Sequence, residues 1–208
     1  MVARGFAEDD GSSLHDNIVC LHDVSWADYE RLLEIRGDHS APRMAYLEGE
    51  LEFMSPSKSH ESIKSTLGRL VEVWCQVNGI EFSAVGSWTL KHEPSQRGVE
   101  PDECYVFGDA ASVAETARPH LAIEIEWTAA ALDKLCIYET LCIGELWVWS
   151  RGRLQVYELR EAGGANAYSP ISQSRALPGL DLRLLERLIE VPTTSQAIRE
   201  FREAIAPV

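Results

Sequence analysis

Four charged side chains lie in segments whose neighbours are mostly apolar. Asp102 begins one predicted strand, Glu124 and Glu126 lie within the next, Leu121–Trp127, and Lys134 follows early in a predicted helix. A charge is costly to bury unless it is paired or bound to a metal ion. Carboxylates on adjacent strands can share one Mg²⁺ or Mn²⁺, because hard cations prefer oxygen ligands. We therefore expect a metal site formed by Asp102 and Glu124.

The chemistry expected of this set is hydrolysis of a phosphodiester bond. A metal ion held by the two carboxylates would polarise a phosphoryl oxygen and lower the pKa of an attacking water. The Lys134 ammonium would stabilise the negative charge that develops on the phosphoryl oxygens. Strand alternation places Glu126 on the same face as Glu124, so Glu126 either contacts the metal ion or pairs with Lys134.

Each of these residues also has an ordinary structural interpretation. Asp102 could be a turn acid that follows a proline, and Lys134 could form a salt bridge on a helix surface. Glu126 could face solvent. Asp102 and Glu124 together favour the ligand interpretation, because acids that point inward from neighbouring strands need a shared cation.

Hydrophobic periodicity predicts the elements that would position these residues. Helices are expected from the N-cap Ser25 to Gly37, from Ser57 to Asn78, from Ala129 to Cys142, from Asp181 to Ile189 and from Thr193 to Ile205. Strands are expected over Glu81–Lys91, Glu103–Phe107 and Leu121–Trp127, with hairpins over Arg43–Phe53 and Glu145–Leu159 that turn at Glu48-Gly49-Glu50 and Arg151-Gly152. The glycine-rich segment Glu161–Ala167 is expected to be a loop. This order indicates an α/β fold with a mixed central β-sheet flanked by helices.

The chain of 208 residues is expected to form a single domain. Residues 1–16 are polar and should form a flexible N-terminal arm, and residues 17–208 should form the domain, with a helical tail over about 181–205. No stretch approaches the ~20 apolar residues of a membrane span, and the N-terminus lacks the pattern of a signal peptide. We expect a cytoplasmic protein, with its five cysteines reduced.

The charge balance bears on the substrate. The chain has 33 acidic and 19 basic residues, a formal net charge of −14, which argues against strong affinity for nucleic acid by the chain alone. A local basic strip or a partner would have to deliver DNA to the site. The candidate basic residues are Lys58, Lys64, Arg69, Lys91 and Arg97.

Several short motifs, taken in order, carry a family resemblance. They are Tyr46–Pro56 followed by His60, then Pro101-Asp102, then Leu121–Ile125, then Asp133-Lys134 with Tyr138, then Gly144–Trp147. Together these motifs resemble the Uma-type restriction endonucleases, which belong to the PD-(D/E)XK nuclease superfamily. The resemblance runs from about Trp26 to Leu159.

The resemblance implies a restriction-endonuclease-like fold with Asp102 and Glu124 as metal ligands. It implies that Lys134 is a catalytic lysine that has moved from the strand to the helix, because Glu126 stands where the superfamily usually carries that lysine. It also implies a supporting acid or base near the entrance of the site, for which Glu50 and His60 are the matching positions. One further departure is Trp127, where the close family generally has serine.

The function that we expect is that of a Mg²⁺- or Mn²⁺-dependent endonuclease whose substrate is DNA. One alternative is a catalytically degenerate member of the same fold that acts as a binding module. Another is a glycoside hydrolase that uses Glu124 and Glu126, which would lie ~7 Å apart along a strand, as acid and base. A homodimer is also expected, because the hairpin Glu145–Leu159 and the tail helices offer much apolar surface.

Overall fold

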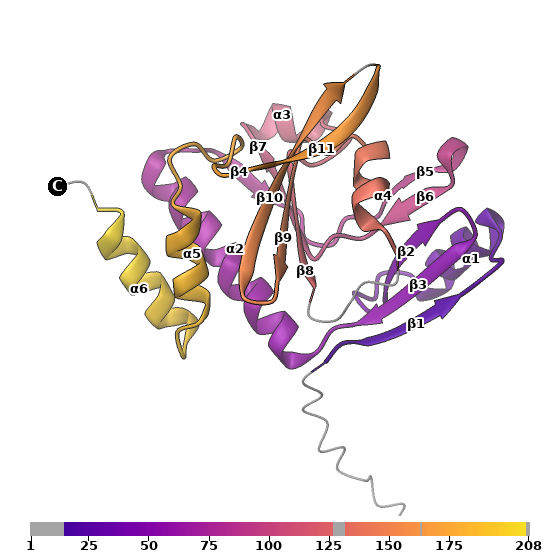
Figure 1. The fold of residues 1–208 in the computed structure, drawn as a ribbon, viewed down its shortest axis with the longest axis horizontal. Helices are drawn as coiled ribbons and strands as arrows, with labels where there is room; N and C mark the ends of the chain where they lie inside the picture. The colour runs from indigo at the N-terminus through magenta and orange to yellow at the C-terminus, as the bar shows by residue number, and fades with distance from the viewer. Residues whose placement is uncertain (1–14, 127–131, 163, 207–208) are drawn as a thin grey trace, which may run out of the picture.

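The computed structural model describes residues 15–126, 132–162 and 164–206, and the strands within them form two sheets (Figure 1). Sheet A has five antiparallel strands in the order β1 (Asn17–Leu21), β3 (Glu50–Ser55), β2 (Arg43–Leu47), β6 (Arg97–Val99) and β5 (Leu90–His92). Sheet B has six strands in the order β11 (Ala165–Ile171), β10 (Arg153–Ala162), β9 (Glu145–Ser150), β8 (Leu121–Glu126), β7 (Glu103–Phe107) and β4 (Phe82–Ala84). Sheet B is mixed, because β8 and β9 run parallel while its other neighbours run antiparallel. The expected α/β class with a mixed sheet and flanking helices is confirmed.

Helices cover these sheets. They are α1 (Trp26–Arg36), α2 (Lys58–Asn78), the short 3₁₀ helix η1 (Glu93–Ser95), α3 (Ala110–Glu115), α4 (Lys134–Thr140), α5 (Leu182–Ile189) and α6 (Thr194–Ala204). One apolar cluster joins one face of sheet B to α2, α5 and α6, and a second joins the other face to α4. A third packs α1 on sheet A. Figure 1 shows α2, α5 and α6 together on one side of sheet B.

Local sequence explains why α1 and α2 begin and end where they do. Ser25 accepts a hydrogen bond from the Asp28 amide at 3.2 Å, and Ser57 accepts one from the His60 amide at 3.2 Å, so both serines cap the free amides of a first turn. Gly79 ends α2 in the left-handed conformation, with φ of 65°, which costs glycine little. These predicted helix ends are confirmed.

The alternation along β8 sets the position of the candidate site. Leu121, Ile123 and Ile125 belong to the cluster with α2, whereas Ala122 belongs to the cluster with α4. Because successive side chains point to opposite faces of a strand, Glu124 lies on the α4 face with Ala122. The predicted grouping of the apolar residues on one face and the acids on the other is therefore confirmed for the described part of the strand. Trp127 lies outside the described residues.

Three sequence predictions are corrected. The segment Glu81–Lys91 forms two short strands in different sheets, because Gly86, with φ of 59°, turns the chain between them. The segment Glu161–Ala167 continues the strand pair β10 and β11 and is not simply a loop. Helix α4 begins at Lys134, because Asp133 caps it; positions 129–131 of the predicted helix lie outside the described residues.

Four short elements were not predicted: β1, the 3₁₀ helix η1, β6 and α3. Three residues of β6 are too few to show an alternation. Asp16, assigned to the predicted N-terminal arm, instead packs into the fold: its side chain is 3% exposed, and its Oδ1 accepts a hydrogen bond from the Ser57 amide at 2.7 Å.

The apolar surface that suggested a homodimer is covered within the chain. Trp147 and Trp149 of the hairpin are 0% and 1% exposed, and Phe201 of the tail is fully buried against the same cluster. The tail helices thus complete the core of sheet B. No described helix is long and apolar enough to span a membrane. The five cysteines are free, as expected.

Candidate functional site

The predicted acids meet where the chain passes from sheet A to sheet B. Asp102 lies in the link between β6 of sheet A and β7 of sheet B, and its amide donates to the Ile123 carbonyl of β8 at 3.1 Å. The Asp102 side chain is thereby held beside Glu124 on the neighbouring strand. Both residues are buried, each 2% exposed.

Three groups of the chain hold the Asp102 carboxylate. Its Oδ1 accepts hydrogen bonds from the Arg43 guanidinium and from His60 Nε2, the latter at 2.9 Å, and its Oδ2 accepts one from the Ile125 amide at 2.6 Å. Burial by itself raises the pKa of Asp102, but the hydrogen bond from His60 and the charge of Arg43 outweigh it, so that the pKa lies below its ordinary value. Asp102 is therefore ionised at neutral pH.

His60 lies between two carboxylates and the Arg43 guanidinium, whose Nη1 is 3.2 Å from His60 Nε2. It lies in the first turn of α2, fully buried, with Nε2 directed to Asp102 and Nδ1 at 2.9 Å from Asp16 Oδ2. The protonated ring can donate to both carboxylates at once, whereas the neutral ring can donate to only one of them. Burial lowers the pKa of His60, but the hydrogen bonds to Asp102 and Asp16 outweigh this, and the pKa is raised. The structure thus joins the predicted residue His60 to the site through Asp102.

Glu124 is held from α4. Tyr138 donates its hydroxyl hydrogen to Oε1, and the Lys134 ammonium donates to Oε2 at 3.1 Å. Burial raises the pKa of Glu124, Lys134 lowers it, and the nearby Asp102 charge raises it again, with a net increase. Because Glu124 is buried next to another carboxylate, a further positive charge would stabilise its ionised form.

Lys134 is the first residue of α4, and its side chain is directed to Glu124 of β8. Its Nζ lies 3.1 Å from Glu124 and 3.6 Å from Glu52 Oε1 of β3. The side chain is 13% exposed. Burial lowers the pKa of Lys134, but the charges of Glu124 and Glu52 outweigh it and raise the pKa. The ammonium therefore bridges an acid of sheet A and an acid of sheet B.

The site has an excess of acid. We define the acid cluster by its five carboxylates and three cations: Asp16, Glu52, Asp102, Glu124 and Glu126, with Arg43, His60 and Lys134. With every group ionised, the cluster lacks two positive charges. Burial raises the pKa of the half-buried Glu126, which Lys134 lowers and Glu52 and Asp102 raise further. A divalent cation would supply the missing charge.

The donor set fits a divalent ion that keeps most of its own water. No three His, Cys, Asp or Glu side chains are grouped as a ready metal cage in the part of the chain that the structure describes. Mg²⁺ does not require such a cage, because it commonly binds one or two carboxylates together with waters and substrate phosphates. Asp102 and Glu124 offer two buried carboxylates for this purpose.

A hollow of about 320 Å³ reaches the cluster from the side of α2. Its lining includes Asp102, Arg43, Glu61, Lys64 and the Gly86–Ser87 turn. Arg43 also binds Glu61 at 3.1 Å, and Lys64 binds Glu61 at 2.6 Å. The hollow thus brings a half-buried lysine and a buried arginine to the Asp102 side of the cluster.

Sequence reasoning named Glu50 but missed Glu52 and Arg43. Glu50 lies at the start of β3, 44% exposed, and pairs with His22, whereas Glu52 is 2% exposed and approaches Lys134. The available signal for Glu52 was its place among the apolar residues of a predicted strand. Arg43 gave a similar signal, because it begins a strand whose next residues are apolar.

Comparisons with known proteins place the chain in a family. The sequence model described as "Uma2: Putative restriction endonuclease" matches residues 26–193. Among solved structures, the chain is similar to a putative nuclease belonging to DUF820 from Anabaena variabilis, with a TM-score of 0.49 and 15% sequence identity, over 75% of this chain and 96% of that one. No curated protein matches the chain.

Proposed function

The chain belongs to the Uma2 family of putative restriction endonucleases, and from that premise we propose that it is a metal-dependent nuclease that hydrolyses phosphodiester bonds of DNA. The observation that carries the proposal is the buried meeting of Asp102, Glu124 and Lys134 in a cluster that lacks two positive charges. Such a cluster is costly to fold, and a divalent cation offsets that cost.

Asp102 and Glu124 would hold Mg²⁺ or Mn²⁺, with Glu126 as a further carboxylate of the cluster. When bound, such an ion polarises a phosphoryl oxygen and lowers the pKa of an attacking water. Lys134 would place its ammonium beside the phosphoryl oxygens, where negative charge increases in the transition state. Its present bridge between Glu124 and Glu52 positions the ammonium for that task.

Other residues of the cluster would act by positioning. Arg43 and His60 keep Asp102 ionised and fix its orientation, because they hold one of its oxygens while the Ile125 amide holds the other. Tyr138 orients Glu124 from α4. These contacts hold the two carboxylates in place before substrate binds, which is the arrangement that hydrolysis requires.

The two alternative functions have less support. A degenerate binding module needs no ammonium beside the paired carboxylates, yet Lys134 is buried there. A glycoside hydrolase is expected to have an open cleft lined by aromatic rings. Glu124 is 2% exposed and paired with Lys134, and the described lining of the hollow beside Asp102 contains no aromatic side chain.

A cleavage assay tests the proposal. Supercoiled, linear and single-stranded DNA are incubated with the wild-type chain in Mg²⁺, in Mn²⁺ and in excess chelator. We expect cleavage with either metal, none with chelator, and none by Asp102→Asn or Glu124→Gln. The matched control is Asp38→Asn, which removes the same charge from an exposed turn. Metal-independent cleavage, or full activity of both cluster variants, would contradict the proposal.

A further inference from the structure

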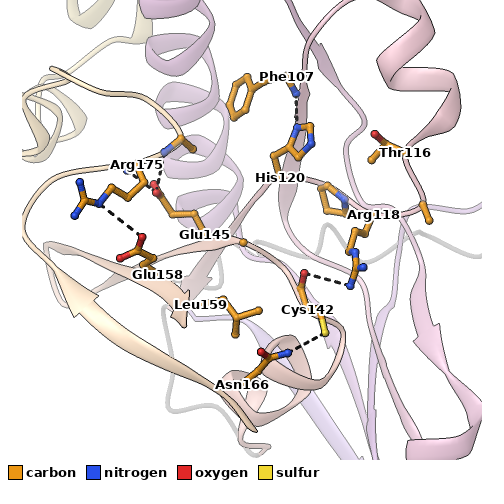
Figure 2. A pocket seen from close by; sticks show the side chains of 14 residues that line it. Phe107, Thr116, Arg118, His120, Cys142, Glu145, Glu158, Leu159, Asn166 and Arg175 are labelled. Atoms are coloured by element: carbon orange, nitrogen blue, oxygen red, sulfur yellow. Dashed lines mark hydrogen bonds and ion pairs between the residues drawn. The ribbon is translucent and has the colours of Figure 1, made fainter. Parts of the chain in front are cut away.

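Two adjoining hollows lie at the other end of strands β7 and β8, away from the acid cluster. The larger, of about 930 Å³, is bounded by residues from the end of β7, the start of β9, the end of β10 and the loop after β11 (Figure 2). The smaller, of about 380 Å³, is bounded by the segment Trp88–His92 and by the end of α4. The two share Ala117, Arg118 and Cys142, so Arg118 lies in the wall between them.

Arg118 is an exposed cation with spare donors. Its Nη1 donates to the carbonyls of Leu141 and Cys142 at 3.3 and 3.5 Å, which fixes the guanidinium at the end of α4. These bonds use one of its three nitrogens. No carboxylate of the described residues forms an ion pair with it within 4.0 Å. In a chain with a net charge of −14, an arginine held in this way is suited to an anionic ligand.

Aromatic rings line the hollows on both sides of Arg118. The larger contains His120 and Phe107, whose rings are nearly parallel, at 11°, with centroids 6.2 Å apart. The Phe107 amide donates to His120 Nδ1 at 2.9 Å, so the ring is fixed and its proton lies on Nε2. The smaller contains the half-buried Trp88. The order is therefore aromatic, cation, aromatic.

Charges farther from Arg118 complete the surface. Figure 2 shows Arg175 on the opposite side of the larger hollow from Arg118. Arg175 Nε lies 3.6 Å from Glu158, which Arg160 also binds at 2.7 Å. Glu145, at the base, is buried and accepts hydrogen bonds from Ser174, Trp147 and two backbone amides. Its charge is thus compensated by local donors.

We propose that this paired hollow binds single-stranded nucleic acid, with a phosphate on Arg118 and a base in the hollow on either side. Unpaired bases can stack on aromatic rings while a cation holds the backbone between them. The bases of a duplex are stacked and paired, so they cannot enter two separate hollows. The inference rests on the proposed function in one respect, since it names the strand state of the nucleic acid that the chain would cleave.

Binding of a labelled oligonucleotide tests the inference. The anisotropy of fluorescein-labelled dT12 is measured with the full chain in excess chelator and low salt, with rU12 and a 12-base-pair duplex as the other probes. We expect dT12 or rU12 to bind at least 10-fold more tightly than the duplex. Arg118→Ala should weaken binding about 10-fold or more, as expected for a lost charged contact. It should also reduce the slope of log K against log salt by about 0.7, the value for one phosphate contact.

The control removes the same charge elsewhere. Arg199 is exposed on α6 and lines neither hollow, so Arg199→Ala should leave both the affinity and the salt slope unchanged. Trp88→Ala should weaken binding about 5- to 100-fold through lost stacking, whereas Trp88→Phe should retain most of it. Because Trp88 is half-buried, thermal melting of both variants separates lost stacking from lost folding.

Three results would overturn the inference: no binding of either single strand, equal binding of duplex and single strand, or wild-type affinity in Arg118→Ala. These results are distinguishable from failure of the proposed nuclease function, because chelator removes any need for hydrolysis. A chain that binds dT12 through Arg118 but cleaves no DNA with metal would retain the inference and lose the nuclease. A chain that cleaves DNA but binds dT12 equally well without Arg118 would retain the proposed nuclease function and refute the inference.

Discussion

Replacing Lys134 with alanine tests the role of the buried ammonium. The change leaves Glu124 and Glu52 facing each other without the cation that lies 3.1 and 3.6 Å from them. Removing one partner of a buried ion pair commonly costs about 3–5 kcal/mol, because the remaining charge is left uncompensated. We expect a loss of this size in the free energy of unfolding at neutral pH, measured by urea denaturation.

The loss should depend on pH in a defined direction. Burial already raises the pKa of Glu124, and removing Lys134 raises it further, because the lysine lowers it in the wild type. Once the Glu124 carboxyl group is protonated, no charge has to be buried there. The loss of unfolding free energy caused by Lys134→Ala should therefore shrink as the pH falls through the pKa of Glu124. The opposite trend, a penalty that grows on acidification, would refute the electrostatic explanation.

Activity and metal response should separate in this variant. Turnover on DNA should fall ~10² to 10³-fold, the usual cost of removing a donor that stabilises transition-state charge. The increase in melting temperature caused by Mn²⁺ should persist, because Asp102 and Glu124 remain, whereas Glu124→Ala should lose both. Lys134→Met keeps the aliphatic stem, so it removes the charge without leaving a cavity. Arg199→Ala, which removes an exposed positive charge of α6, is the control. Wild-type cleavage by Lys134→Ala would refute the assignment of this lysine.

Two further predictions concern neighbouring groups. The raised pKa of His60 means that its stabilising contribution is complete below its ordinary value of 6.5 and is lost as the pH rises through the folded-state pKa. The stability difference between wild type and His60→Gln, from urea denaturation, should therefore be largest in mild acid and smaller in alkali, and a constant difference would show that His60 is neutral. Glu126→Gln should reduce Mn²⁺ affinity and turnover less than Glu124→Gln does, because Glu126 is half-buried. Calorimetric titration measures the affinity and cleavage rates measure the turnover. A loss in Glu126→Gln equal to or greater than that in Glu124→Gln would contradict this prediction.

The two main hairpins and five of the helices, α1, α2, α4, α5 and α6, could be predicted because local signals agree with the final packing. Ser25, Ser57, Asp181 and Thr193 cap helices where the apolar periodicity begins. The pairing of Glu124 with Lys134 also follows from local order, because a helix that starts soon after a strand brings its first turn back over the strand's end. These features depend on short stretches of chain.

The division into two sheets could not be predicted in the same way. Strands β5 and β6 have three residues each, too few for a period of their own; β6 pairs with β2, and β5 pairs with β6. Glu52 and Arg43 belong to the site only because sheet A brings β2 and β3 beside the end of β8. A single buried charge in a strand indicates that a partner exists, but tertiary pairing decides which one.

Direct titration with Mn²⁺ tests the central claim, that Asp102 and Glu124 hold one divalent ion. The free ion is followed by electron paramagnetic resonance while it is added to the full chain near neutral pH. We predict one bound ion per chain, at least a 10-fold weaker affinity in Asp102→Asn and in Glu124→Gln, and near wild-type affinity in Asp38→Asn. Absence of a bound ion in the wild type, or unchanged affinity in both cluster variants, would contradict the claim.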